Sequence, residues 1–328
     1  MNKFFPILLM GCLSMLFAEV FSGASQMWFF YLWGIFLTMP LYLAHILFFL
    51  WIALYLKKTT ITQLYFFGVI FGLYESWITK VLWTGYMDSA GPGLGTFLGL
   101  GIIEFPILVF FWHPIMSFIL PILVFEILTN KILVEHEHIL TRKRWKTIII
   151  VFFLVFLSFF LCNGNQFNIV SANTSFISSL LLVLVFYYLS KPMDLNVFKF
   201  GKKGFIIITF YLFLLYVVTF VLFSPERIPN TIMPYISIIV FYVISILFIA
   251  KLNENVSDLM VVNNSLYSIN DIIKFTIIMF FAINLACLLP SIKFSIFFSI
   301  YLLFSVLGLI LFIVVVFGVI KKFLKNGS

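Results

Sequence analysis

The sequence predicts an all-α membrane protein, a bundle of about ten transmembrane helices with both termini in the cytoplasm. Of its 328 residues, 63% are hydrophobic and only 10% are charged, and the mean hydropathy is +1.18. A water-soluble domain is nearer half apolar and a quarter charged, so this chain has too little polar surface to cover a soluble globule. Its apolar runs are continuous, whereas the strands of a membrane β-barrel would alternate.

Ten apolar segments are long enough to be membrane spans, because about 20 residues of helix cross a bilayer. Two of these segments are longer than one span requires. Pro40 and Pro114 are the expected kink points within them, and either long segment could instead be a re-entrant turn followed by a helix. The ten segments are 4–21, 27–56, 62–83, 96–128, 146–163, 172–190, 205–223, 233–250, 272–290 and 294–320.

The positions of lysine and arginine orient these segments. With the N-terminus inside, sixteen of the 20 basic residues fall on the cytoplasmic side, and only Arg227 and Lys293 fall outside. The remaining two, Lys80 and Lys274, lie within spans. Cytoplasmic loops of membrane proteins carry such an excess of basic residues, so the pattern predicts ten spans with both termini cytoplasmic.

The net charge and the cysteines indicate which kinds of binding partner, metal site and cofactor to expect. The net charge is +8, but the basic residues lie in short loops between spans, which indicates a topology signal and no nucleic-acid partner. Cys12, Cys162 and Cys287 lie in or at the end of apolar segments and are expected to be buried free thiols, since no CxxC or Cys/His zinc motif occurs. No motif indicates a cofactor, and the sequence leaves any metal unassigned. The expected partners are the lipid bilayer and a membrane protein or peptide.

The ionisable side chains divide the chain into two modules. Residues 1–128 form an N-terminal module of four spans that holds the intramembrane acids and the membrane histidines. Residues 129–328 form a C-terminal module of six spans rich in Phe, Ile, Leu and Val. The second module begins with a charged loop, in which the Glu-His-Glu-His run at 135–138 is expected to be solvated. Any functional site is therefore expected before residue 128.

Glu75 is the strongest candidate for a functional residue. It lies in Phe-Gly-Leu-Tyr-Glu-Ser-Trp-Ile-Thr-Lys (71–80). A carboxylate inside a span costs about 2.5–3.5 kcal/mol on insertion scales, so such residues face a protein interior or a water cavity and are paired there. Small residues on the same helical face allow neighbouring helices to approach closely. The expected inward stripe consists of Gly68, Gly72, Glu75 and Thr79.

Several other polar side chains lie close enough along the chain to support Glu75. We expect Glu75 to reach at least one of three groups: Lys80, Glu104 or His113. Glu104 and His113 share the fourth segment, but they are nine residues apart and face opposite sides of a straight helix. The remaining supporting candidates are Ser76, next to Glu75, and Glu19, near the outer end of the first span. Glu126, at the inner end of the fourth segment, is expected to be interfacial.

Three stretches resemble a known group of proteins: 18–23, Ala-Glu-Val-Phe-Ser-Gly; 71–77, Phe-Gly-Leu-Tyr-Glu-Ser-Trp; and 111–126, which begins Phe-Trp-His-Pro. They resemble uncharacterised prokaryotic membrane proteins that are distantly similar to the CAAX-protease and bacteriocin-processing superfamily of intramembrane glutamate proteases. That superfamily carries Glu-Glu-x-x-x-Arg on one helix and Phe-x-x-x-His on another. The resemblance places this chain in a prokaryotic plasma membrane.

The same resemblance assigns roles to two residues. Glu75 falls on the water-activating glutamate and His113 on the histidine of the second motif. Ser76, Lys80 and Val109 stand where the superfamily carries Glu, Arg and Phe, so the motifs are degenerate. The resemblance covers residues 18–126.

Three classes of function remain open at this point. The first is a non-catalytic membrane partner on a degenerate protease-like scaffold, which a Glu75–Lys80 pair in a dry core would favour. The second is an intramembrane hydrolase, metal-independent or metal-assisted, which requires Glu75 and His113 within about 5 Å of each other around a water. The third is a proton- or cation-coupled transporter, which requires a continuous polar path across the bundle.

Overall fold

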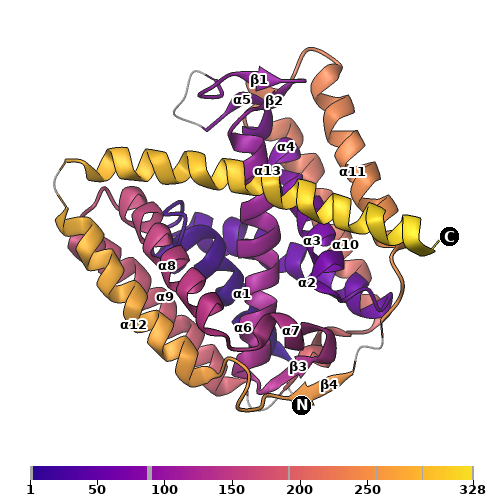
Figure 1. The fold of residues 1–328 in the computed structure, drawn as a ribbon. Helices are drawn as coiled ribbons and strands as arrows, with labels where there is room; N and C mark the ends of the chain where they lie inside the picture. Colours follow the sequence, from indigo (N-terminus) through magenta and orange to yellow (C-terminus); the bar gives the residue numbers. More distant parts are fainter. Residues whose placement is uncertain (1–2, 87–90, 191–192, 256–257, 290, 327–328) are drawn as a thin grey trace. The chain divides into compact units, whose positions relative to one another are not determined.

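The computed structural model describes residues 3–86, 91–190, 193–255, 258–289 and 291–326, and these are overwhelmingly helical (Figure 1). The prediction of an all-α fold is confirmed. Eight helices are long and apolar enough to cross a membrane: Gly34–Tyr55, Pro106–Leu128, Arg144–Gly164, Ile169–Leu189, Lys202–Leu222, Met233–Lys251, Ile269–Leu288 and Lys293–Lys325. A shorter apolar helix covers Phe4–Val20. These nine correspond one to one with nine of the ten predicted spans.

The tenth predicted span, 62–83, is not one continuous helix. It is divided into α3 (Ile61–Gly72), α4 (Tyr74–Trp77) and α5 (Val81–Thr84). Lys80, which precedes α5, has φ +59°, a left-handed conformation that cannot continue a right-handed helix. The periodicity of the apolar residues carries no signal for such a break, because apolar residues occur in each of the three pieces.

The two long predicted segments begin with non-helical or irregular structure. Segment 27–56 opens with a short 3-10 turn, Trp28–Phe30, before the π-helical Gly34–Thr38 and α2 (Met39–Tyr55). Segment 96–128 opens with the hairpin of β1 (Thr96–Phe97) and β2 (Leu100–Gly101). The helix that follows is π-helical over Pro106–Ile119, with Pro114 inside it, and continues as α6 (Leu120–Leu128). A proline removes an intrahelical hydrogen bond, and the wider π turn accommodates it here without ending the helix.

The first of two compact units consists of residues 1–46, 120–200 and 256–300. Its helices are α1 (Phe4–Met15), α6, α7 (Glu137–Leu140), α8 (Arg144–Gly164), α9 (Ile169–Leu189) and α12 (Ile269–Leu288). The most extensive packing within it joins α8 to α12 and α1 to α9. A small antiparallel sheet pairs β3 (Lys131–Leu133) with β4 (Leu259–Val261).

The second unit consists of residues 47–119, 201–255 and 301–328. It contains α3, α4, α5, the hairpin, the π-helical segment Pro106–Ile119, α10 (Lys202–Leu222) and α11 (Met233–Lys251). Most of α13 (Lys293–Asn326) also belongs to it. Its most extensive packing joins α3 to the π-helical segment, and α11 also packs on α3. Each unit combines three separate stretches of sequence. The predicted modules, 1–128 and 129–328, were defined by where ionisable side chains lie along the chain, and that division stays a prediction.

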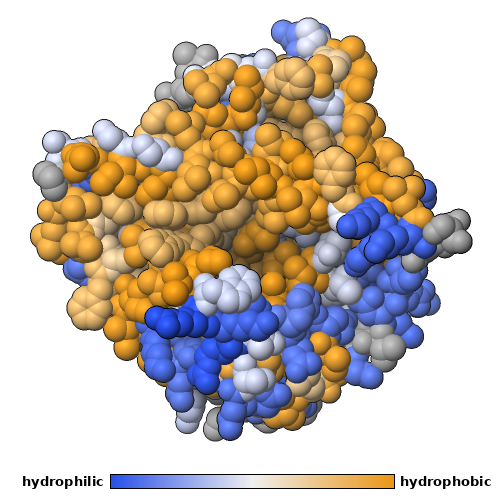
Figure 2. All heavy atoms as spheres, in the orientation of Figure 1, coloured by the Kyte–Doolittle hydropathy of each residue, from blue (hydrophilic) through white to orange (hydrophobic). Residues whose placement is uncertain are grey.

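Long helices of this unit carry large apolar side chains on their exposed sides. Along α13 these include Val306, Leu309, Val314 and Phe317, and Figure 2 shows the hydrophobic surface of this helix. Exposed apolar faces of this length match the hydrocarbon core of a bilayer, which takes about 20 helical residues to cross. The surface thus agrees with the membrane protein predicted from composition.

Candidate functional site

Glu75 is placed by two glycines in the helix that precedes it. A methyl group added at Gly68 would collide with the backbone of Pro114, and one at Gly72 would lie 3.1 Å from Cβ of His113. The absence of side chains at these positions therefore lets α3 lie directly against the π-helical segment. The small-residue stripe predicted from the sequence does face a neighbouring helix. Glu75, on α4 just after this contact, is 8% exposed.

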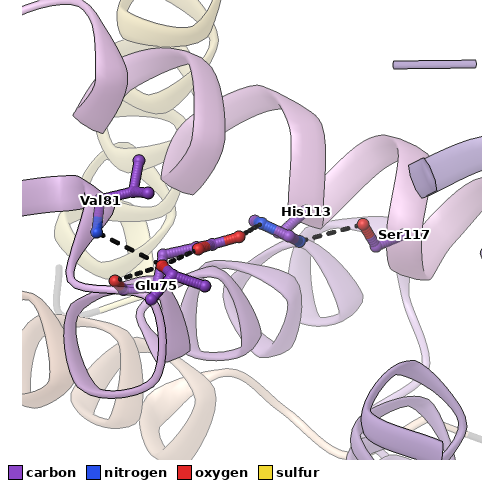
Figure 3. A network of polar contacts seen from close by, with 5 residues as sticks. Glu75, Val81, His113 and Ser117 are labelled. Atoms are coloured by element: carbon purple, nitrogen blue, oxygen red, sulfur yellow. Dashed lines mark hydrogen bonds and ion pairs between the residues drawn. The ribbon is translucent and has the colours of Figure 1, made fainter. Parts of the chain in front are cut away.

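Glu75 and His113 are in direct contact. Nε2 of His113 lies 3.1 Å from Oε1 of Glu75, and the side chain of His113 is 1% exposed. Nδ1 of the same ring lies 3.0 Å from Oγ of Ser117, one turn further along the helix. Figure 3 shows the three side chains in a row, from carboxylate to imidazole to hydroxyl. Of the three partners expected for Glu75, the structure brings His113 to it.

The second carboxylate oxygen of Glu75 is held from its own side of the site. The Thr79 hydroxyl donates to Oε2 of Glu75 and also lies 2.9 Å from the backbone carbonyl of Glu75. The backbone N–H of Val81 donates to the Thr79 hydroxyl over 3.3 Å (Figure 3). At the break between α4 and α5, the backbone N–H of Val81 is therefore available to the Thr79 hydroxyl, whereas in a regular helix it would donate to a backbone carbonyl of the same helix. The Glu75 carboxylate is consequently fixed at both oxygens.

Proton transfer is the chemistry that this row of groups supports. One arrangement that satisfies every group has the Ser117 hydroxyl donating to Nδ1 of His113, while Nε2–H of His113 donates to the Glu75 carboxylate. A carboxylate in hydrogen-bond contact with an imidazole is a pair that can hold and pass a proton. Tyr74 and Phe71 line the ring of His113, with centroid distances of 5.0 and 5.5 Å, so an apolar wall covers the pair.

Lys80 is engaged elsewhere. It is fully buried, and its Nζ donates to the backbone carbonyls of Thr219, over 2.9 Å, and of Phe223. These carbonyls belong to the C-terminal end of α10, where the helix leaves its last acceptors without partners and a cation is stabilising. The rings of Phe220 and Phe223 lie 5.5 and 6.0 Å from the same Nζ. Lys80 therefore caps α10, and the ion pair with Glu75 that was one of the alternatives is not formed.

The other supporting candidates have separate environments. Oε1 of Glu104 accepts from the backbone N–H of Gly93 over 3.3 Å, while its Oε2 is buried without a hydrogen-bond partner in the described part of the chain. The Ser76 hydroxyl is likewise buried with no partner among the described residues. Glu19 belongs to the other compact unit, where its Oε2 accepts from the Ser25 hydroxyl over 2.5 Å.

Three buried residues take positions that the sequence did not assign to them. Ser117 follows His113 by four residues, a spacing at which side chains on one helix meet, and that spacing could have found it. The other two, Glu126 and His136, belong to the other compact unit, and the sequence placed them at an interface and in a solvated loop. Both are fully buried, with Nδ1 of His136 2.8 Å from Oε2 of Glu126, so the expectation of a solvated His136 was wrong.

The donors around Glu75 can be compared with what a metal requires. A catalytic zinc takes three protein ligands, whereas the Glu75 and His113 pair offers two. Within the described ranges, no three His, Cys, Asp or Glu residues gather in a way that could hold a metal ion.

Comparison with known proteins gives a family but no activity. A family described as "Uncharacterized membrane protein family" has a model that matches residues 8–324. An "Uncharacterized protein" of Archaeoglobus fulgidus is 45% identical over 119 residues, which is 36% of this chain. The chain spans only 37% of the length of that relative. No solved structure matches.

Proposed function

The chain belongs to the uncharacterized membrane protein family whose model it matches, and from that premise we propose that it is an intramembrane hydrolase. In this proposal Glu75 is the general base that takes a proton from water, and His113 holds and assists the carboxylate. The substrate is an amide or ester bond within a membrane-embedded partner, such as a membrane protein or peptide. Multi-pass membrane character rests on the family match and on the eight long apolar helices.

The observation that carries the proposal is the contact between Nε2 of His113 and Oε1 of Glu75, at 3.1 Å. Both groups lie within apolar segments, where a polar side chain is expensive and is retained mainly for pairing or function. The distance is within the range that general acid–base catalysis requires of two groups that share a proton. The degenerate resemblance to intramembrane glutamate proteases adds support, because it assigns water activation to the same Glu75.

The chain's own residues allow the steps to be written. Water attacks the carbonyl carbon of the scissile bond, and its proton passes to the Glu75 carboxylate. The carbon–nitrogen or carbon–oxygen bond then breaks, and the proton moves from Glu75 to the leaving group. His113, oriented by Ser117, donates from Nε2 to Glu75 and stabilises the negative charge of the carboxylate before it takes the proton and again after it has passed the proton to the leaving group. Thr79 keeps the other oxygen in place throughout.

The two alternatives from the sequence have less support. A non-catalytic membrane partner, in which Glu75 is purely structural, would be favoured by an ion pair with Lys80, but Lys80 caps α10. A transporter would be favoured by a continuous polar path, whereas the groups next to His113 include the rings of Phe71 and Tyr74. A non-catalytic membrane partner would retain the Glu75 and His113 contact without turnover, and the experiment below separates these outcomes.

Isotope incorporation tests the proposal without a known substrate. The full chain is reconstituted in liposomes with peptides and lipids extracted from prokaryotic membranes, in water enriched in heavy oxygen, and products are read by mass spectrometry. Wild type should introduce the heavy oxygen into new carboxyl groups, and Glu75→Gln should reduce the rate by about 100-fold or more. Glu254→Gln, at an exposed position, is the matched control and should keep the wild-type rate. Equal incorporation by wild type and Glu75→Gln would refute a catalytic Glu75.

The orientation in the membrane belongs to the same proposal. Both termini lie in the cytoplasm, on the basis of the sixteen-to-two distribution of basic residues, and the protein is in the plasma membrane, as the resemblance to prokaryotic membrane proteins implies. Single cysteines introduced at Lys143 and Phe200 should be labelled by an impermeant reagent only from inside, and one at Asn168 only from outside. Labelling of positions 143 and 168 from the same side would contradict this topology.

A further inference from the structure

Helices α8 and α12 run in parallel and are joined at their N-terminal ends. Just before α8, the guanidinium of Arg142 lies 3.6 Å from the carboxylate of Asp271 in the first turn of α12. The hydroxyls of Thr147 and Tyr267 are 3.1 Å apart. These polar contacts lie at the N-terminal ends of both helices. The basic residues of the loop 129–146 lie next to the same end of α8.

The opposite ends of the same two helices bring two cysteines into contact. Cys162 lies in the last turn of α8 and Cys287 in the last turn of α12, and their Sγ atoms are 3.4 Å apart. The Cys162 thiol also lies 3.5 Å from the backbone carbonyl of Ile283. Both side chains are buried. They are 125 residues apart in the sequence, so only the pairing of α8 with α12 brings them together.

We propose that Cys162 and Cys287 form a disulfide that joins the outer ends of α8 and α12. A disulfide bond places the sulfur atoms about 2.05 Å apart. The two sulfurs already lie in van der Waals contact at 3.4 Å, so the bond requires them to approach each other by only about 1 Å more. From the sequence both were expected to be free thiols, since neither spacing nor motif connects them.

The charges at the other end of α8 place the cysteines on the oxidising side. Arg142, Lys143, Arg144 and Lys146 gather at the N-terminal end of α8, which the excess of basic residues in cytoplasmic loops assigns to the cytoplasm. The C-terminal ends of α8 and α12 therefore lie at the outer face of the membrane. Disulfides form and persist outside the reducing cytoplasm.

The reaction is a thiol–disulfide exchange with an oxidised disulfide carrier outside the membrane. The two thiols lose two protons and two electrons as the sulfur–sulfur bond forms, and the carrier disulfide is reduced to a dithiol. Cys162 and Cys287 are consumed together, so the chain retains a single thiol, that of Cys12. The bond would close a long loop that includes α9, α10 and α11, and restricting such a loop in the unfolded chain stabilises the folded one.

Counting thiols in the full chain tests the proposal. Cells are lysed in the presence of a thiol-alkylating maleimide, the protein is denatured and purified, and its intact mass gives the number of labels. Wild type should carry one label, and three when it is reduced before labelling. Cys12→Ser should carry none before reduction and two after it. Cys162→Ser should carry two labels with or without reduction.

Two results would overturn the proposal. One is three labels on wild-type protein that has not been reduced, which would show that all thiols are free. The other is a labelled thiol on unreduced Cys12→Ser, which would show that Cys162 and Cys287 are not paired with each other. Because wild type and Cys12→Ser decide the matter, the test does not depend on the folding of Cys162→Ser. Neither result bears on Glu75, so the hydrolase proposal stands or falls separately.

Discussion

Two buried acid–histidine pairs occur in the described part of the chain, and they are built from the same side chains but are held by different partners. Glu126 gives one oxygen to His136, at 2.8 Å, and the other to the backbone N–H of Leu133, also at 2.8 Å. Glu75 gives one oxygen to His113 and the other to the Thr79 hydroxyl. The first carboxylate therefore holds the backbone at the end of β3, while the hydrogen bonds of the second among the described residues go to the side chains of His113 and Thr79.

The different partners suit the two pairs to different roles, one in stabilising the fold and the other in proton transfer. A backbone N–H can only donate a hydrogen bond. The N–H of Leu133 therefore needs an oxygen acceptor at the position of Glu126, whether or not Glu126 is protonated. Hydroxyl and imidazole groups can each donate or accept, so the partners of Glu75 can adjust when a proton moves. Glu126 and His136 are also completely buried, whereas Glu75 keeps 8% of its surface exposed. A pair that stabilises the fold and a pair that transfers protons are expected to differ in these ways.

The largest expected effect is on the stability of the fold, at Glu126. Glu126→Leu leaves the N–H of Leu133 and the imidazole of His136 buried without their acceptor, which should lower the free energy of unfolding by about 3–5 kcal/mol. Detergent-induced unfolding in mixed micelles measures this change. Glu254→Leu, at an exposed position, is the control and should stay within about 0.5 kcal/mol of wild type. A Glu126→Leu protein as stable as that control would remove the structural half of the comparison.

A smaller loss of stability is expected at Lys80, the group that was a candidate partner of Glu75. Lys80→Met keeps the length of the side chain but removes the donor to the carbonyl of Phe223 and one of the two donors to that of Thr219, which still accepts from the N–H of Phe223, at a cost of about 1–3 kcal/mol. The same unfolding assay applies. Lys274→Met is the matched control, since Lys274 also lies in a predicted span but is exposed on α12, and it should change little. Equal effects of the two substitutions would argue against the capping role.

Glu75 itself should matter little for stability. Glu75→Gln preserves the shape of the side chain, and His113 and Thr79 can each reorient to donate to or accept from the amide. The free energy of unfolding should change by less than about 1 kcal/mol, although hydrolysis is lost. A loss of stability as large as that of Glu126→Leu would show that both pairs are structural.

The smallest effect on the rate of hydrolysis is expected at Ser117, which positions His113 and does not touch substrate. Ser117→Ala should lower the rate of heavy-oxygen incorporation by about tenfold, and Ser117→Thr should restore it, because threonine retains the hydroxyl. Ser76→Ala is the control: its buried hydroxyl has no partner in the described residues, so its removal should leave the rate unchanged. Failure of Ser117→Thr to restore activity after a loss in Ser117→Ala would point to packing at this position.

Much of the fold followed from the sequence because membranes impose a simple requirement. A bilayer offers no hydrogen-bond partners, so a spanning segment must be a helix with about 20 apolar residues, and nine of ten predicted segments are long or short apolar helices. The break at Leu73 and Lys80 could not be predicted in this way. At the second break Lys80 donates to the end of α10, a contact across 139 residues of sequence, and the local periodicity of apolar residues carries no information about such a contact.

The sequence by itself determined that Glu75 must be paired, because an isolated carboxylate in an apolar segment is too costly to leave without partners. It also determined, through Gly68 and Gly72, which face would meet another helix. Only the tertiary structure decided that the partner is His113, that Lys80 caps α10, and that Cys162 meets Cys287. The physical reason is that a buried polar group needs a hydrogen-bond partner, but its local sequence does not say which one. The partner depends on which helices pack against each other in the folded chain.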